Sequence, residues 1–184
     1  GSIVPGADLY VYFTENTLAG FVRAVKQAIH DDHHNHVVSI SWASAEDSQN
    51  GMYTGLMNQT LHEAVILGIP VCLSAGDYGS SGEPAGSRDE FVHVDFPGSS
   101  PFALACGGTK LETKNGAIES EVVWNASKSV INGKTVDLGA TGGGVSVLFG
   151  VPSYQAEVTV PKSVNPDGGT GRGVPDVAGN ANYL

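Results

Sequence analysis

Short apolar runs alternate with helix-like segments through residues 1–108 of the chain. Four runs are typical of strands: 7–13 (ADLYVYF), 36–42 (HVVSISW), 70–76 (PVCLSAG) and 102–108 (FALACGG). Two segments between them place apolar side chains at helical spacing: Leu18, Val22, Val25 and Ile29 in the first, and Tyr53, Leu56, Met57, Thr60, Leu61, Ala64 and Val65 in the second. Asn16 or Thr17 can cap the first helix, and Gly68 is suited to end the second.

This alternation predicts an α/β fold, in which a parallel sheet is covered by helices on both faces. After Gly108 the pattern changes. Asn115–Gly116 lies between two strand-like stretches and Asn132–Gly133 repeats the signal, so we expect β-hairpins in the C-terminal half. The sequence shows no internal repeat and no interdomain linker, which favours a single domain over residues 1–184.

Three of the apolar runs finish in small residues: SISWAS, CLSAGD and LACGGT. In an open parallel sheet, ligands bind outside the carboxyl ends of the strands. Small residues at that edge leave room for a peptide chain to lie against exposed backbone. The alternative is that they merely end the strands.

Composition narrows the possible partners. Only 15% of the 184 residues are charged, against about 25% in a typical domain, and 41% are hydrophobic, which argues against disorder. The net charge of -10 disfavours nucleic acid and anionic membrane surfaces. It suits a secreted protein or one that works in acid, although cytoplasmic proteins also reach this balance. No apolar run approaches the ~20 residues that a membrane span needs.

The cysteines and histidines carry no strong metal signal. Cys72 and Cys106 each sit within an apolar run, so we expect small hydrophobic core residues; a disulfide would require the two runs to be neighbouring strands. Zinc-site spacing is absent. The segment 30–36 (HDDHHNH) has a metal-binding composition, but it follows the end of a helix, where histidine also complements the helix dipole. We predict no metal site in this chain.

Five collinear strings resemble the sedolisins, the serine-carboxyl peptidases, and the kumamolisin branch of that family in particular. They are SISW at 39–42, SAGDYGS at 74–80, VDFPGSSPFALACGGT at 94–109, TGGGVS at 141–146 and GRGVPDVAGNA at 171–181. The resemblance runs in order along nearly all of the chain. It implies a subtilisin-like fold, which the alternation of strands and helices fits.

The resemblance also implies a catalytic apparatus: a Ser nucleophile, a Glu base, an Asp that orients the Glu, and a second Asp in the oxyanion hole. Asp77 in SAGDYGS matches the last of these. The Glu and Asp pair precedes the segment that resembles residues 1–13, and the Ser lies in a Gly-Thr-Ser-Ala-type turn that this sequence does not contain. We therefore expect the central part of a peptidase domain, inactive alone, with the family's Ca²⁺ site outside this chain and no cofactor within it.

The chemistry expected of Asp77 depends on its protonation. A donor aimed at the oxyanion stabilises acyl transfer, but an ionised carboxylate only accepts hydrogen bonds. Asp77 can donate only when it is neutral, which requires acid or an environment that favours the neutral form. The alternative is that Asp77 caps a turn before Gly79.

The expected substrate-binding residues follow two of the predicted strands. Backbone at Ser41, Trp42 and Ala43 can pair with a substrate strand, and Ser74, Ala75 and Gly76 wall the pocket for the residue before the cut. Trp42 is also consistent with a plain core residue. Asp95 either lines a subsite that favours a basic side chain or caps a turn. The glycines at 142–144 either allow close backbone approach or form a flexible loop.

The sequence thus favours a fragment of a secreted, acid-acting serine-carboxyl endopeptidase. Its expected partners are a polypeptide substrate, the remaining segments of the same domain and its propeptide. One alternative is a non-catalytic binding or scaffold module with the same fold. Another, a nucleotide-binding domain, is disfavoured because TGGGVS lacks phosphate-loop spacing and does not directly follow a strand.

Overall fold

The computed structural model describes residues 3–82, 89–126, 128–136, 138–166 and 168–181. The helices are α1 (Leu18–His30) and α2 (Gly51–Ile66), with 3₁₀ turns η1 (Glu46–Ser48), η2 (Gly79–Ser81) and η3 (Ser153–Gln155). The strands are β1 (Val38–Ile40), β2 (Ser44–Ala45), β3 (Val71–Ser74), β4 (Asp95–Phe96), β5 (Leu104–Lys114), β6 (Ala117–Val123), β7 (Ser129–Ile131), β8 (Lys134–Val136), β9 (Gly144–Val145), β10 (Gly173–Val174) and β11 (Val177–Asn180).

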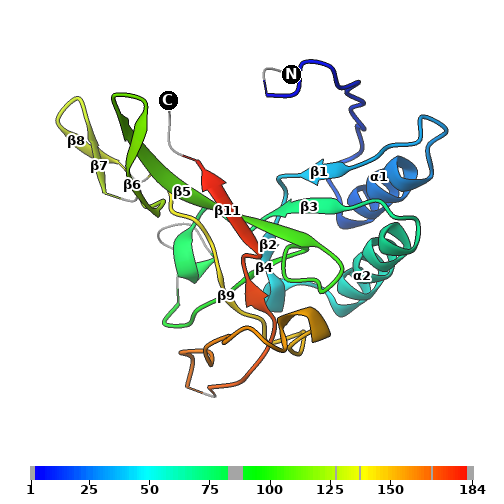
Figure 1. Cartoon of the computed structure of the whole chain (residues 1–184). Coiled ribbons are helices and arrows are strands. Elements are labelled where there is room, and N and C mark those ends of the chain that lie inside the picture. Colours follow the sequence, from blue (N-terminus) through cyan, green and yellow to red (C-terminus); the bar gives the residue numbers. More distant parts are fainter. Residues whose placement is uncertain (1–2, 83–88, 127, 137, 167, 182–184) are drawn as a thin grey trace.

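A mixed, mostly parallel sheet organises the molecule (Figure 1). Its order is β1-β3-β5-β11, with all neighbours parallel, and β6 adds antiparallel to the outer half of β5. Three small antiparallel pairs, β2–β4, β7–β8 and β9–β10, lie around it. Three of the four predicted strands are confirmed, at β1, β3 and β5.

The predicted strand at 7–13 is wrong. No strand forms there, and Leu9, Val11 and Phe13 are 69%, 73% and 92% exposed. The segment is tied to the loop after α1 by side chains: the Tyr10 ring stacks on His33, and Asn35 donates to the Tyr12 hydroxyl at 2.7 Å. An alternating apolar pattern is realised as a strand only when a neighbour offers its backbone, and β1 pairs with β3 alone.

Both predicted helices begin where their capping residues lie. The Thr17 hydroxyl accepts from the backbone N–H of Gly20 at 3.0 Å, and the Asn50 side chain accepts from that of Met52 at 2.8 Å. The second helix ends at Ile66, two residues before Gly68, which has a positive φ. The caps therefore fix the helix boundaries locally.

The core lies between the two helices and one face of the sheet. It contains Val25 and Ile29 of α1, Tyr53, Met57, Leu61 and Ala64 of α2, Val71 and Leu73 of β3, and Phe96. Figure 1 shows α1 and α2 side by side, and they contact each other. The described helices thus cover one face only. Cys72 and Ser74, which alternate with Val71 and Leu73 along β3, are half-buried.

Both predicted hairpins are confirmed. Asn115 and Gly116, with φ of 52° and 78°, join β5 to β6, and Asn132 and Gly133, with φ of 51° and 76°, join β7 to β8. Positive φ at both central residues defines the tight hairpin turn that Asn-Gly favours.

Candidate active site

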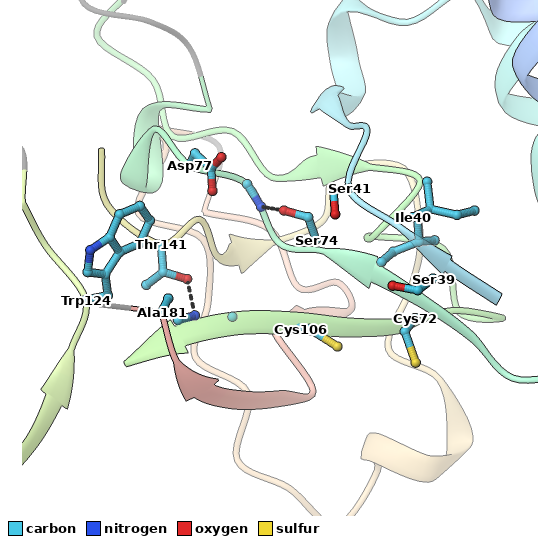
Figure 2. Close-up of a pocket in the computed structure, with 14 residues that line it drawn as sticks. Ser39, Ile40, Ser41, Cys72, Ser74, Asp77, Cys106, Trp124, Thr141 and Ala181 are labelled. Carbon is cyan, nitrogen blue, oxygen red and sulfur yellow. Dashed lines mark hydrogen bonds between the residues drawn. The ribbon is translucent and has the colours of Figure 1, made fainter. Parts of the chain in front are cut away.

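The carboxyl edge of the parallel sheet carries the candidate site. The ends of β1 and β3 lie side by side there, because Ile40 pairs in register with Leu73. Ser41 follows β1, Ser74 ends β3, and Asp77 comes three residues later. As predicted, these residues share one edge of the sheet (Figure 2).

Two hollows meet at Asp77. One, of about 400 Å³, is lined by Ser41, Trp42, Ala43, Ser44, Ser74, Gly76, Asp77, Tyr78, Gly82 and Asp95. The other, of about 250 Å³, runs along the sheet face opposite the helices and includes Ser39, Cys72, Cys106, Trp124 and Thr141. We call the first the substrate hollow and the second the sheet hollow. Seven of the eight residues proposed from sequence line the substrate hollow.

Ala75 is the exception among the proposed site residues. Its side chain is buried with Val94, Ala105 and Val174, and it is absent from the walls of both hollows. Because side chains alternate along an extended backbone, Ser74 and Gly76 face the hollow while Ala75 packs inward.

The alternative of a core Trp42 is wrong. Its side chain is 61% exposed at the rim of the substrate hollow, with one tilted ring contact to Phe21. Asp95 is 5% exposed and also lines this hollow. Two carboxyl groups, those of Asp77 and Asp95, therefore lie in the lining of the substrate hollow.

The loop that carries Asp77 is held by backbone hydrogen bonds from the 140–142 segment. The backbone N–H of Ala140 donates to the Asp77 carbonyl, and that of Gly142 donates to the Gly76 carbonyl, both at 2.8 Å. In the other direction, the backbone N–H of Gly79 donates to the Ala140 carbonyl at 2.9 Å. Thr141 N–H in turn donates to the Trp124 carbonyl at 3.0 Å. The structure therefore supports close backbone approach, rather than a free loop, for the glycines at 142–144.

Gly142 has no room for a side chain. A Cβ there would lie 1.9 Å from the Ala75 carbonyl oxygen. We expect Gly142→Ala to lower the free energy of unfolding by about 1–3 kcal/mol, the usual cost of forcing extra volume into packed structure. Gly150→Ala is the control, because a Cβ at Gly150 has no neighbour within 4 Å. Urea unfolding of the complete protein measures both, and equal midpoints would contradict the proposed contact.

The two cysteines are free, and both line the sheet hollow. Each is half-buried, so neither is the fully buried core residue that the sequence predicts. Cys72 pairs in register with Leu104, and Cys106 lies two residues further along β5. Burial, followed by the neighbouring Cys72 thiol, raises the pKa of Cys106. A raised pKa disfavours the thiolate, so Cys106 is a poor candidate for a nucleophile.

The sequence analysis missed several residues around Asp77. Trp124, Thr141, Tyr78 and Gly82 line the hollows. Thr141 was visible as the start of TGGGVS, but no local pattern connects Trp124 with Asp77. Among the described residues, no three His, Cys, Asp or Glu side chains are placed to hold a metal ion.

Comparisons with known proteins identify relatives of this chain. Kumamolisin of Bacillus sp. (strain MN-32) is 48% identical over 182 residues, which cover 98% of this chain and 31% of that protein. Sedolisin of Pseudomonas sp. (strain 101) is 35% identical, covering 76% of the chain and 24% of its own length. Tripeptidyl-peptidase 1 of Homo sapiens is 31% identical, over a stretch that covers 78% of this chain and 24% of that protein. No family model matches the chain.

A solved structure gives the same result for the fold. Pseudomonas sedolisin (serine-carboxyl proteinase), complexed with two molecules of pseudo-iodotyrostatin, matches with a TM-score of 0.70 and 31% identity over 90% of this chain and 43% of that one. The fold is that of a subtilisin-like α/β protein. The chain belongs to the sedolisin family, in its kumamolisin branch. It spans about a third of the length of kumamolisin.

Proposed function

We propose that the complete protein is a secreted serine-carboxyl endopeptidase that cleaves polypeptides in acid through an acyl-enzyme. This chain contributes the oxyanion-hole carboxyl of Asp77 and the subsites for the substrate strand. The observation that carries the proposal is the gathering of Asp77, Ser41, Trp42, Ser74 and Asp95 around one hollow at the carboxyl edge of the sheet. The printed names of the relatives, peptidases and a serine-carboxyl proteinase, support the reaction class.

Each wall of the substrate hollow has a role in this proposal. Residues 41–43 lie beyond the end of β1 and are exposed, so their backbone is open to pair with an extended peptide. Ser74 and Gly76 form the opposite wall. Gly76 is required at φ 104°, where a Cβ would collide with the Asp95 carboxyl. Asp77 projects beside them and donates to the oxyanion when it is neutral.

The remaining parts of the proposed enzyme lie outside this chain. The nucleophile, its Glu and Asp partners, the calcium ion and the propeptide are assigned to other segments of the complete protein. In the part of the chain that the structure describes, neither helix has the length and hydropathy to cross a bilayer.

The test is proteolysis by the complete protein, freed of any propeptide, with denatured casein as substrate across acid and neutral pH. We expect peptide-bond cleavage in acid, and none by the 184-residue chain, which retains only oxyanion and binding effects. A complete protein that binds peptides and cleaves none at any pH would instead be a non-catalytic module. Activity of the short chain that survives Asp77→Ala would show that the site is misplaced.

Asp95 gives a specificity prediction. Its buried carboxyl in the substrate hollow is placed to pair with an Arg or Lys side chain of the substrate. In the complete protein, Asp95→Asn is expected to reduce kcat/KM for peptides that carry Arg near the cut by about tenfold, equivalent to ~1.4 kcal/mol. Matched peptides with Gln in place of Arg are the control. An equal loss for both peptides would reduce Asp95 to a turn residue.

A further inference from the structure

His93 lies between two carboxylates from different segments. Its Nδ1 is 2.7 Å from Asp47 Oδ2, and its Nε2 is 3.0 Å from Asp89 Oδ1. An ionised carboxylate only accepts hydrogen bonds, whereas a neutral imidazole has one donor and one acceptor nitrogen. Both contacts are satisfied only when both ring nitrogens carry a proton. With both carboxyl groups ionised, the geometry therefore favours a charged His93.

The surroundings of His93 favour that charge. The side chain is 12% exposed. This burial alone would lower the pKa of His93, but the hydrogen bonds and charges of Asp89 and Asp47 outweigh it and raise the pKa above the ordinary 6.5. The hydrogen bond from His93 in turn lowers the pKa of Asp89. The neighbouring carboxyl of Glu46 points elsewhere, accepting from the Ser146 hydroxyl at 2.8 Å.

The position of His93 links the two walls of the substrate hollow. On one side, the backbone N–H of His93 donates to the Ser80 carbonyl at 2.9 Å. The His93 Cβ also lies 3.0 Å from the position that a Cβ on Gly82 would take. Gly82 itself lines the hollow. On the other side, Asp47 belongs to η1, which directly follows β2 and the 41–43 segment. The Asp47–His93–Asp89 cluster therefore joins the walls from behind.

We propose that His93 is a positioning residue for the substrate hollow: as an imidazolium it clamps the wall of residues 80–82 to the wall that follows β1, and it releases that wall on losing its proton. This inference rests on the proposed peptidase function. Among the described residues, Asp47 of η1 and Asp89 of the segment before β4 are the charged groups that face the ring.

The direction of the pH effect follows from the raised pKa. A group whose pKa is higher in the folded protein contributes its full stabilisation below the unfolded value and loses it as the pH rises through the folded value. The imidazolium is fully formed below about pH 6.5, the ordinary value for histidine, and it is lost as the pH rises through the raised pKa of His93. At the acid end the clamp lasts until the Asp89 carboxyl takes up a proton, and the hydrogen bond from His93, which lowers the pKa of Asp89, extends that range downward. Substrate affinity should weaken on the neutral side independently of the catalytic groups.

The charge on His93 is tested without any activity measurement. In the complete protein labelled with ¹⁵N-histidine, NMR should show both His93 ring nitrogens protonated at about pH 6.5, where half of ordinary histidines are neutral. Asp89→Asn should lower the titration midpoint of His93. His36, an exposed histidine before β1, serves as the internal reference. An ordinary midpoint for His93, unmoved by Asp89→Asn, would overturn the clamp.

The positioning role is tested by kinetics on a peptide first identified from casein cleavage. His93→Gln should raise KM in acid by about tenfold, the equivalent of ~1.4 kcal/mol, while kcat changes much less. Wild-type KM should rise with pH through the NMR midpoint of His93, and His36→Gln, at an exposed histidine, should change neither KM nor kcat. An unchanged KM in His93→Gln would overturn the positioning role. If the complete protein cleaves nothing, the proposed function fails while the NMR titration still decides whether the clamp exists.

Discussion

Replacing Asp77 with alanine in the complete protein is expected to lower kcat by about 10²–10³-fold, the loss typical of one oxyanion-hole donor. Asp77 is exposed at the carboxyl edge of the sheet, where the substrate hollow and the sheet hollow meet. Its loop is fixed by the backbone bonds from the 140–142 segment, so the donor is held in place before substrate binds.

Asp77→Asn separates the charge of the side chain from its geometry. The amide donates at any pH and matches the carboxyl in size. We expect this variant to retain part of the activity and to carry it toward neutral pH, limited by the proposed Glu and Asp partners, which would titrate on their own.

The measurement for both Asp77 variants is a pH–rate profile alongside wild type, with the exposed Asp32→Ala as a matched control. Equal profiles for Asp77→Ala and wild type would make Asp77 a turn residue. An asparagine variant as inactive as alanine at every pH would mean that the carboxyl does more than donate one hydrogen bond.

Asp176→Ala is expected to lower the free energy of unfolding by about 3–5 kcal/mol, because it leaves a buried guanidinium without its counter-ion. Arg172 is fully buried, and its Nη2 donates to Asp176 at 2.6 Å and to the Ala103 carbonyl at 3.0 Å. Asp176 also accepts from the backbone N–H of Ala105 at 2.7 Å. This ion pair therefore ties the chain just before β11 to the start of β5.

Urea unfolding of the complete protein measures the effect of Asp176→Ala. Asp176→Asn should fall between alanine and wild type, since the amide oxygen can still accept from Ala105 but carries no charge. Glu15→Ala, which breaks the exposed ion pair with Arg23, is the control and should change stability little. Equal midpoints for Asp176→Ala and Glu15→Ala would show that the buried pair contributes nothing.

The sequence by itself determined the local elements and the family. The cap at Thr17, one of two predicted candidates, sets the start of α1, and Asn-Gly pairs set both hairpins, because each of these depends on backbone geometry within a few residues. Asp77 was found from its string SAGDYGS, and its place at the carboxyl edge follows from strand direction alone in a parallel sheet.

The tertiary structure decided what depends on residues far apart in the sequence. The apolar alternation at 7–13 forms no strand because its backbone finds no partner, which no local pattern reveals. Trp42 proved exposed because it lies beyond the end of β1, at the rim of the substrate hollow. Ala75 proved buried because it packs against Val94, Ala105 and Val174. His93 stands 46 residues from Asp47 in the sequence, so their pairing arises only when β4 is laid against β2.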